Sequence, residues 1–273
     1  MGENEGKEFT FWDHLDELRK ILFRVLIVVV SAMVGVFLNK EILFNVVLAP
    51  HRADFVTYRL LCQLAEWLAV PSVCPEAFTA ELINTQLPSQ FMVHMSVAFY
   101  VGVLLVFPYV LYQVYRFVSP ALYASERRYS MRIIVFSSLL FFAGVLLNYF
   151  LIFPFSFRFL ATYQVSAEIE NLINLSSYID TLMLLSLMLG IMSEMPVISW
   201  LFAKLGFLSA PFMKKHRKHA VILILILLAV ITPTTDIITL MLVFAPIYAL
   251  FELSIWIVKR SEKLENGKLR IEN

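Results

Sequence analysis

The chain alternates between long apolar runs and short polar stretches. Six runs of predominantly apolar residues stand out along the sequence. They cover residues 21–38, 91–115, 133–153, 178–202, 220–232 and 237–258. Runs of this length with few charges are typical of transmembrane helices. The pattern therefore predicts an all-α, polytopic membrane domain over residues 21–258, preceded by an amphipathic segment (1–20) and followed by a polar tail (259–273).

The distribution of Lys and Arg predicts the orientation of these spans. Three fall in the N-terminal tail, four between spans two and three, five between spans four and five, and five in the C-terminal tail. That makes 17 on one side of the membrane, against four on the other. Because cytoplasmic loops carry the excess of Lys and Arg, both termini are expected in the cytoplasm. The net charge of +1 gives no indication of nucleic-acid binding.

The fifth span is unusually short. Thirteen apolar residues in a helix reach only about 20 Å, whereas the hydrocarbon core of a bilayer is about 30 Å thick. We expect the connection after Thr232 to lie below the outer surface or to thin the bilayer locally.

The outer loop, residues 39–90, is the longest segment between spans and is expected to contain short helices. It holds both cysteines, Cys62 and Cys74, on the side predicted to be oxidising. A disulfide between them is one interpretation, and it would stabilise the protein by about 3 kcal/mol. Two unrelated thiols are the alternative.

Carboxylates near and inside the membrane are the candidate functional groups. The N-terminal segment has a capping-box pattern at Thr10, which predicts a helix. Its apolar residues form a stripe along one side of that helix, and Glu17 lies off this stripe, so Glu17 is expected to face the cytoplasm. Glu126 lies in the loop between spans two and three. For both residues a solvated acidic face is the simpler interpretation from periodicity alone.

Glu194 lies inside span four, roughly 13 Å from its cytoplasmic end if the span is helical. A carboxylate at that depth is costly and is a functional candidate by default. Pro196 follows two residues later and is expected to kink the helix there. A protonated glutamate bonded to a neighbouring helix is the alternative. Glu252 lies closer to the cytoplasmic end of span six and is a weaker candidate.

Several classes of enzyme lack support in this sequence. There is no glycine-rich phosphate loop, no Gly-x-Ser-x-Gly elbow and no His-Glu-x-x-His zinc motif. The methionines of span four have no His or Cys beside them, so they are interpreted as packing residues and not as metal ligands. We expect no catalytic residue, no metal and no cofactor.

The motifs, taken in order, resemble the TatC family, the multispanning subunit of the twin-arginine protein translocase. They are residues 14–19 (HLDELR), 49–50 (AP), 117–123 (FVSPALY), 126–128 (ERR) and 194–196 (EMP), followed by Pro246 and Glu252. The resemblance covers roughly residues 9–260. It implies a glove-like, concave arrangement of six helices in a bacterial-type inner membrane.

The resemblance also implies a function and a site. TatC proteins bind the twin-arginine signal peptides of folded precursors and, with TatA-type and in some cases TatB-type single-span partners and further copies of TatC, export them using the proton-motive force. Glu17 and Glu126, with Leu18 and Arg19 of the first motif, correspond to the signal-peptide site. Glu194, with Pro196, corresponds to the intramembrane pocket. A proton-coupled solute transporter using Glu194 and Glu252 is the alternative function.

Overall fold

Helices make up almost all of the structure, a computed structural model that describes residues 11–52, 54–67, 81–118, 130–164, 166, 171–232 and 237–272. The elements follow one another as α1 (Phe11–Leu38), α2 (Lys40–Val47), η1 (Ala49–His51), α3 (Val56–Trp67), β1 (Leu82–Ile83), α4 (Ser89–Val118), α6 (Ser130–Leu147), η4 (Asn148–Ile152), α7 (Phe153–Thr162), β2 (Ile173–Asn174), α8 (Leu175–Ser193), α9 (Met195–Lys204), α10 (Ala210–Lys215), α11 (Arg217–Ile231) and α12 (Ile237–Glu272).

Five helical segments of the described chain are long and apolar enough to cross a membrane. They are Leu15–Leu38, Ser89–Val118, Met131–Thr162, Leu175–Lys204 and Thr239–Lys263. The expected all-α polytopic class is therefore confirmed. The fifth predicted span corresponds to α11, whose 15 residues reach only about 23 Å, so a sixth crossing stays a prediction.

Two helices are longer than the apolar segments that predicted them. Helix α1 starts at Phe11 and continues without a break to Leu38, so the amphipathic segment and the first span form one rod. Helix α12 continues to Glu272 through the segment expected as a separate tail. That segment is rich in Lys, Arg and Glu, which favour helices.

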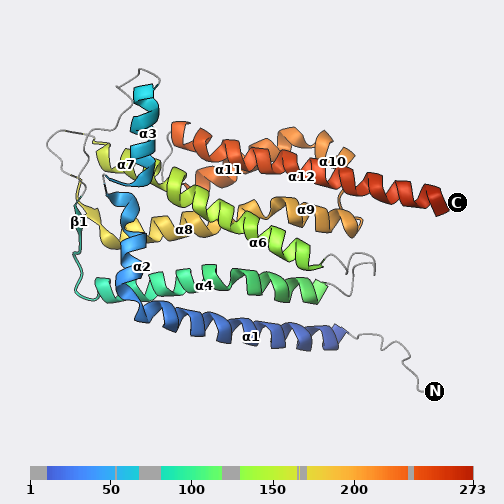
Figure 1. Cartoon of the computed structure of the whole chain (residues 1–273), viewed down its shortest axis with the longest axis horizontal. Helices are drawn as coiled ribbons and strands as arrows, with labels where there is room; N and C mark the ends of the chain where they lie inside the picture. The colour runs from blue at the N-terminus through green and yellow to red at the C-terminus, as the bar shows by residue number, and fades with distance from the viewer. Residues whose placement is uncertain are drawn as a thin grey trace.

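The long helices pack in neighbouring pairs. Helix α1 packs along α4, α6 along α8, and α9 along α12, and Figure 1 shows α1 and α4 side by side. At Gly102 the two backbones approach closely, because a Cβ atom there would lie 3.0 Å from the Met33 nitrogen. Large apolar side chains remain exposed on the outside of the bundle, as a surface that faces lipid requires.

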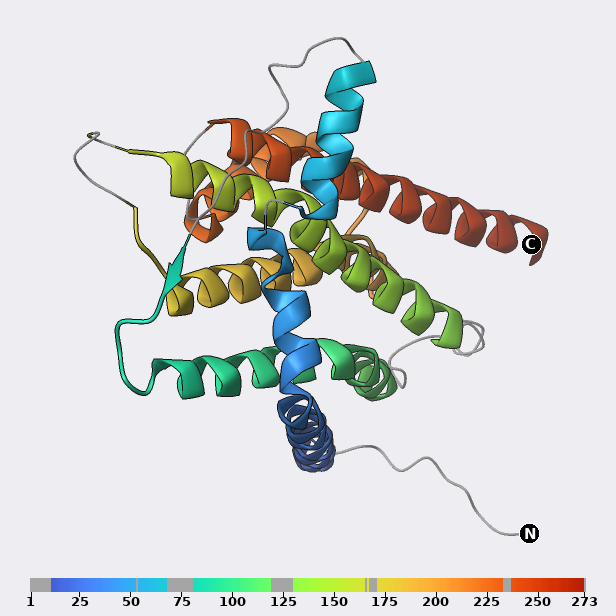
Figure 2. The same ribbon diagram turned by 60° about the vertical axis from the view of Figure 1, so that its left-hand side comes forward.

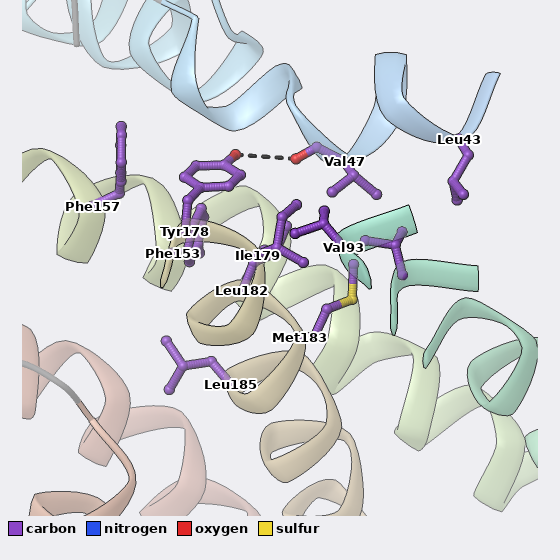
Figure 3. Packing of buried hydrophobic residues seen from close by; sticks show 11 residues of the cluster. Leu43, Val47, Val93, Phe153, Phe157, Tyr178, Ile179, Leu182, Met183 and Leu185 are labelled. Carbon is purple, nitrogen blue, oxygen red and sulfur yellow. Dashed lines mark hydrogen bonds between the residues drawn. The ribbon is translucent and has the colours of Figure 1, made fainter. Parts of the chain in front are cut away.

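Short elements close one end of the bundle. Helices α2 and α3 cross the ends of the long helices (Figure 2). The hydroxyl of Tyr178 on α8 donates to the carbonyl of Val47 at 3.1 Å, which attaches α2 to the core (Figure 3). Strands β1 and β2 pair in parallel, with Leu82 opposite Ile173, and so link the segments that precede α4 and α8.

The third span contains a π-helical turn. Element η4 connects α6 to α7, and it places Asn148 in the interior with no exposed surface. The Asn148 amide donates to the Ser186 hydroxyl at 2.9 Å and, at 3.4 Å, to the Leu182 carbonyl. This turn, which extends the third span to Thr162, was not predicted because its hydrophobic pattern does not differ from that of an α-helix.

Candidate functional site

Several helix termini meet at one end of the bundle. Helix α1 begins there, α4 and α9 end there, α6 begins there, and α12 runs out beyond it (Figure 1). We call this the basic end, because many Lys and Arg residues of these helices, of α10 and of the start of α11 lie at it. They include Arg19, Lys20, Arg116, Arg132, Lys204, Lys214, Lys215, Lys218, Lys259, Arg260 and Lys263.

The first turns of α1 carry Glu17, Leu18 and Arg19 at the basic end. Glu17 is half-buried, whereas Leu18 and Arg19 are exposed. The Arg19 guanidinium lies 3.9 Å from the Asp16 carboxylate, and both side chains are mostly exposed. An exposed pair at that distance contributes at most about 1 kcal/mol, so Arg19 is readily displaced from Asp16.

The apolar stripe of α1 remains uncovered. Leu15, Leu18 and Leu22 are all exposed in the chain. The stripe therefore faces lipid or a bound segment, in agreement with its expected position at the membrane surface.

Glu126 lies outside the described residues. Helix α4 ends at Val118, one residue before the segment that contains Glu126. Because α4 packs along α1, the last described residue before Glu126, Val118, lies at the same end of the bundle as Glu17.

Span four is broken at Glu194, as the proline two residues further on predicts. Helix α8 ends at Ser193, and α9 begins at Met195 with Pro196 in its first turn. Glu194 occupies the junction, and its carbonyl accepts from the backbone nitrogens of Val197 and Ile198 at 3.0 Å. The break turns the Glu194 side chain into the protein instead of toward lipid, and only 5% of its surface is exposed.

The Glu194 carboxylate lines a cavity of about 280 Å³. Three walls come from α4, α6 and α9, and nearly all of the lining is apolar: Phe107, Leu111, Val114, Tyr115, Val118, Ile133, Ile134, Ser137, Ile191, Val197, Ile198 and Leu201. One carboxylate oxygen, Oε2, accepts a hydrogen bond from the Ser137 hydroxyl on α6. The other oxygen, Oε1, is buried with no hydrogen-bond partner. The site thus presents one unused acceptor in an apolar space beside the last turns of α4.

Ser137 was not predicted as a site residue. The available signal was a pair of serines, Ser137 and Ser138, inside the apolar run of span three. Only the packing of α6 on α8 shows that Ser137 meets Glu194, 57 residues away, whereas Ser138 donates to its own helix at the Ile134 carbonyl.

Glu252 has a different environment. Its Oε2 atom accepts from the Arg217 guanidinium on α11 at 2.7 Å, and its Oε1 atom accepts from the Tyr248 hydroxyl at 3.0 Å. Both oxygens are therefore already bonded. The structure gives Glu252 the role of joining α11 to α12, which weakens the case for a transporter in which it relays protons.

The outer loop contains one described cysteine. Cys62 lies in α3 and is part of a disulfide. Cys74 lies outside the described residues, so their pairing stays a prediction. Among the described residues, no cluster of three His, Cys, Asp or Glu side chains could hold a metal ion.

Fold and site together define a multispanning α-helical membrane protein with a buried acid at a helix break. In the described part of the chain, Glu194 is the one buried charged residue. An ionisable side chain inside a bilayer is costly to bury and is therefore a functional candidate.

Comparison with known proteins then identifies the family. The sequence profile of the Sec-independent protein translocase protein (TatC) matches residues 13–246. The chain is 36% identical to the Sec-independent protein translocase protein TatC of Blattabacterium sp. subsp. Periplaneta americana, over 93% of this chain and 97% of the relative. It is 30% identical to TatC of Carboxydothermus hydrogenoformans, over 93% and 95% of the two chains.

A solved structure agrees with this result. The crystal structure of the twin-arginine translocase receptor TatC superposes with a TM-score of 0.70 and 25% sequence identity, over 91% of this chain and 99% of that one. The chain belongs to the TatC family. It is thus a membrane-embedded component of a protein translocase, and that family is one of translocation subunits and not of enzymes.

Proposed function

We propose that this chain binds twin-arginine signal peptides at the basic end of its bundle, between the start of α1 and the segment that follows α4. The packing of α1 along α4 is the observation that carries the proposal. It brings Glu17 and Val118, the last described residue before Glu126, to one end of two adjacent helices. In support, the solved relative is described as the twin-arginine translocase receptor.

The chemistry of the two glutamates fits a peptide with two arginines. A guanidinium is planar and always charged, and it binds a carboxylate through two parallel hydrogen bonds. Lysine has the same charge without that geometry. Since exposed ion pairs contribute only about 0–1 kcal/mol each, Glu17 and Glu126 supply selectivity more than affinity.

Most of the affinity then comes from the apolar part of the signal peptide. The uncovered stripe of α1, which includes Leu15, Leu18 and Leu22, lies in the same turns of the helix as Glu17 but on a different face. Burying one leucine side chain contributes about 1.5–3 kcal/mol. We place Leu18 and Arg19 at the border of the peptide site.

Glu194 is proposed to act in transport more than in binding. Its free oxygen, Oε1, is buried at the break that precedes Pro196, and Glu194 lines an apolar cavity. A polar side chain on a single-span TatA-type or TatB-type helix, or a water molecule, could satisfy that acceptor. The same cavity provides apolar walls for the partner helix.

The rest of the proposal concerns setting and energy. We place the chain in a bacterial-type inner membrane, as a multi-pass protein with both termini in the cytoplasm, because the basic end carries most of the Lys and Arg residues. There it works with further copies of itself and exports folded proteins using the proton-motive force.

Photo-crosslinking in membrane vesicles tests the peptide site. A photoreactive residue replaces Leu18, and two signal peptides that differ only in Arg-Arg or Lys-Lys are offered. We expect crosslinks to the Arg-Arg peptide that the Glu17→Ala and Glu126→Ala variants weaken. The Asp16→Ala variant, one residue away and exposed, is the matched control and should crosslink normally.

Equal crosslinking of both peptides, or equal losses in the Asp16 and Glu17 variants, would refute this location of the site. Glu194→Ala should bind the peptide normally but export poorly. Normal export by that variant would remove Glu194 from the mechanism.

A further inference from the structure

Helix α3 lies at the end of the bundle opposite the basic end. It runs across the direction of the long helices, and its last turns project beyond the bundle (Figures 1 and 2). Two hydrogen bonds attach its first turn to span three. The Thr57 hydroxyl donates to the Phe150 carbonyl, and the Tyr58 hydroxyl donates to the Pro154 carbonyl at 2.9 Å. Because Pro154 has no N–H to offer the Phe150 carbonyl, the Thr57 hydroxyl supplies a donor there.

These two bonds define the depth of α3 in the membrane. Span three is continuous from Met131 to Thr162, and the exposed Arg132 lies at its basic end. A helix rises about 1.5 Å per residue, so about 20 residues cross a hydrocarbon core of about 30 Å. Counted from Arg132, that distance ends near Ile152, between the two acceptors Phe150 and Pro154. The first turn of α3 therefore lies where acyl chains meet headgroups, in the leaflet opposite the basic end, which we call the far leaflet.

The first span gives the same depth independently. Lys20 and Lys40 are both exposed, and they flank the apolar run 21–38 of α1. Their separation along the chain again corresponds to about 30 Å of helix, so Lys40 marks the far edge of the hydrocarbon core. Helix α2 begins at Lys40, and from there α2 and η1 lead to α3 without returning toward the basic end (Figure 2).

Helix α3 has an apolar face directed away from the bundle. Tyr58, which faces the bundle, is only 6% exposed. Residues of a helix are rotated by about 100° from one to the next, which places Val56, Leu60 and Trp67 within about 40° of one another and opposite Tyr58. These three side chains are 52%, 53% and 82% exposed. In water, such a face on a single short helix would leave a large apolar surface uncovered.

The charged residues of α3 lie on a flank between these two faces. Arg59 and Glu66 are both exposed and are rotated by about 90° from the apolar face. The Arg59 guanidinium lies 3.6 Å from the Asp54 carboxylate, and both side chains are mostly exposed. Cys62, which is part of a disulfide, is rotated only about 40° from Tyr58, so the cross-link does not start from the apolar face. An apolar face beside a charged flank is typical of helices that lie in a membrane interface.

We propose that α3 is an interfacial helix that binds the lipids of the far leaflet, with Val56, Leu60 and Trp67 among the upper acyl chains and Arg59 and Glu66 toward water. The medium that α3 meets at this depth, where it projects beyond the bundle, is the bilayer itself. Tryptophan is enriched at membrane interfaces, and Trp67 stands at the projecting end of the helix.

This attachment gives span three a defined depth. The span has 32 residues, which extend over about 48 Å, so it is longer than the hydrocarbon core and its length alone does not fix its position. A helix that lies in the interface and is bonded to Phe150 and Pro154 holds this part of span three at the far edge of the core.

Tryptophan fluorescence tests the proposal. The chain has four tryptophans, and replacing Trp12, Trp200 and Trp256 by Phe leaves Trp67 as the reporter. The full-length protein is placed in vesicles of phosphatidylcholine brominated either near the headgroup or near the middle of the bilayer, and iodide is added to the water in a separate titration. The apolar face of an interfacial helix lies only about 5–10 Å into the headgroup boundary. We therefore expect the shallow bromines to quench Trp67 more than the deep ones, and iodide to quench it weakly.

Every other environment of α3 gives a different result. Strong quenching by iodide with none by brominated lipid would show that the apolar face lies in water. Weak quenching by both would show that protein covers it, either a second copy of the chain or another partner. Stronger quenching by the deep bromines would place α3 in the hydrocarbon core. Each of these three results would overturn the proposal.

A pair of variants tests the division into faces. Leu60→Asp removes one leucine from the lipid contact and should shift the equilibrium between the embedded and the water-exposed helix by about 10- to 150-fold. Quenching of Trp67 by iodide should then rise, and quenching by the shallow bromines should fall. Glu66→Gln, on the charged flank, is the matched control and should change neither. An equal response of the two variants would contradict the assignment of the apolar face to lipid.

Discussion

The hydrogen bond from Ser137 to Glu194 gives the sharpest test of the intramembrane site. Replacing Ser137 by Ala removes the one described donor to the carboxylate. Glu194 Oε1 already lacks a partner, so both oxygens of a side chain that is 5% exposed would then be buried without a bond. Leaving a buried acceptor unsatisfied costs about 1–3 kcal/mol, which corresponds to about a 5- to 150-fold change in an equilibrium or a rate.

Two assays separate the ways in which this cost can appear. One is thermal unfolding of the purified protein in detergent, and the other is the rate of export of a folded twin-arginine reporter. We expect Ser137→Ala to slow export while the signal peptide still binds. Ser138→Ala is the matched control, because Ser138 is the next residue and bonds only within its own helix at the Ile134 carbonyl.

A double-mutant cycle decides whether Ser137 acts through Glu194. If Ser137 only holds the carboxylate, Ser137→Ala should have little further effect in a Glu194→Ala background. An undiminished effect in that background would refute the reasoning, and so would an identical effect of Ser138→Ala.

Three further predictions concern helix packing and the outer loop. Gly144→Ala places a methyl group 2.6 Å from the Leu189 carbonyl oxygen and should destabilise the purified protein by about 1–3 kcal/mol; Gly35→Ala, with no atom within 4 Å, should not. The Arg217–Glu252 pair, with side chains 45% and 34% exposed, should show a coupling of about 0.5–1 kcal/mol in a double-mutant cycle, and zero coupling would contradict its role in joining α11 to α12. Burial raises the pKa of Tyr58 from 10.0 to about 12. The stability that this group contributes is therefore complete below pH 10 and is lost as the pH rises toward 12. The free energy of unfolding measured across that range should depend less on pH in Tyr58→Phe than in the unmodified protein, and an unchanged pH dependence would contradict the burial of the Tyr58 hydroxyl.

The lipid-facing helices could be predicted from the sequence because their signal is local. An apolar run such as residues 91–115 excludes water along its whole length, and it forms the helix Ser89–Val118 whatever its neighbours are. The break at Glu194 could be predicted for the same reason, since Pro196 affects the backbone of its own turn. The family could be identified from the order of short motifs along the chain, which requires no knowledge of the contacts between helices.

The partners of the buried polar groups could not be predicted in this way. Ser137 and Glu194 are 57 residues apart, and Arg217 and Glu252 are 35 apart. Which serine of span three faces span four depends on the rotation of α6 about its axis, and hydrophobicity leaves that rotation open when a helix is apolar on all sides. The two-residue strands β1 and β2 are too short to show a period of two.

The sequence by itself determined that this chain is an α-helical membrane protein, where its long helices lie and which family it belongs to, because these properties depend on runs and motifs within single segments. Only the tertiary structure decided that Glu194 faces a cavity with one oxygen held by Ser137, that Glu252 is paired with Arg217, and that α3 is bonded to span three at Phe150 and Pro154. These features depend on how closely and at what angle distant helices pack. That is settled by close contacts such as Gly144, whose missing side chain lets α6 approach the Leu189 carbonyl of α8.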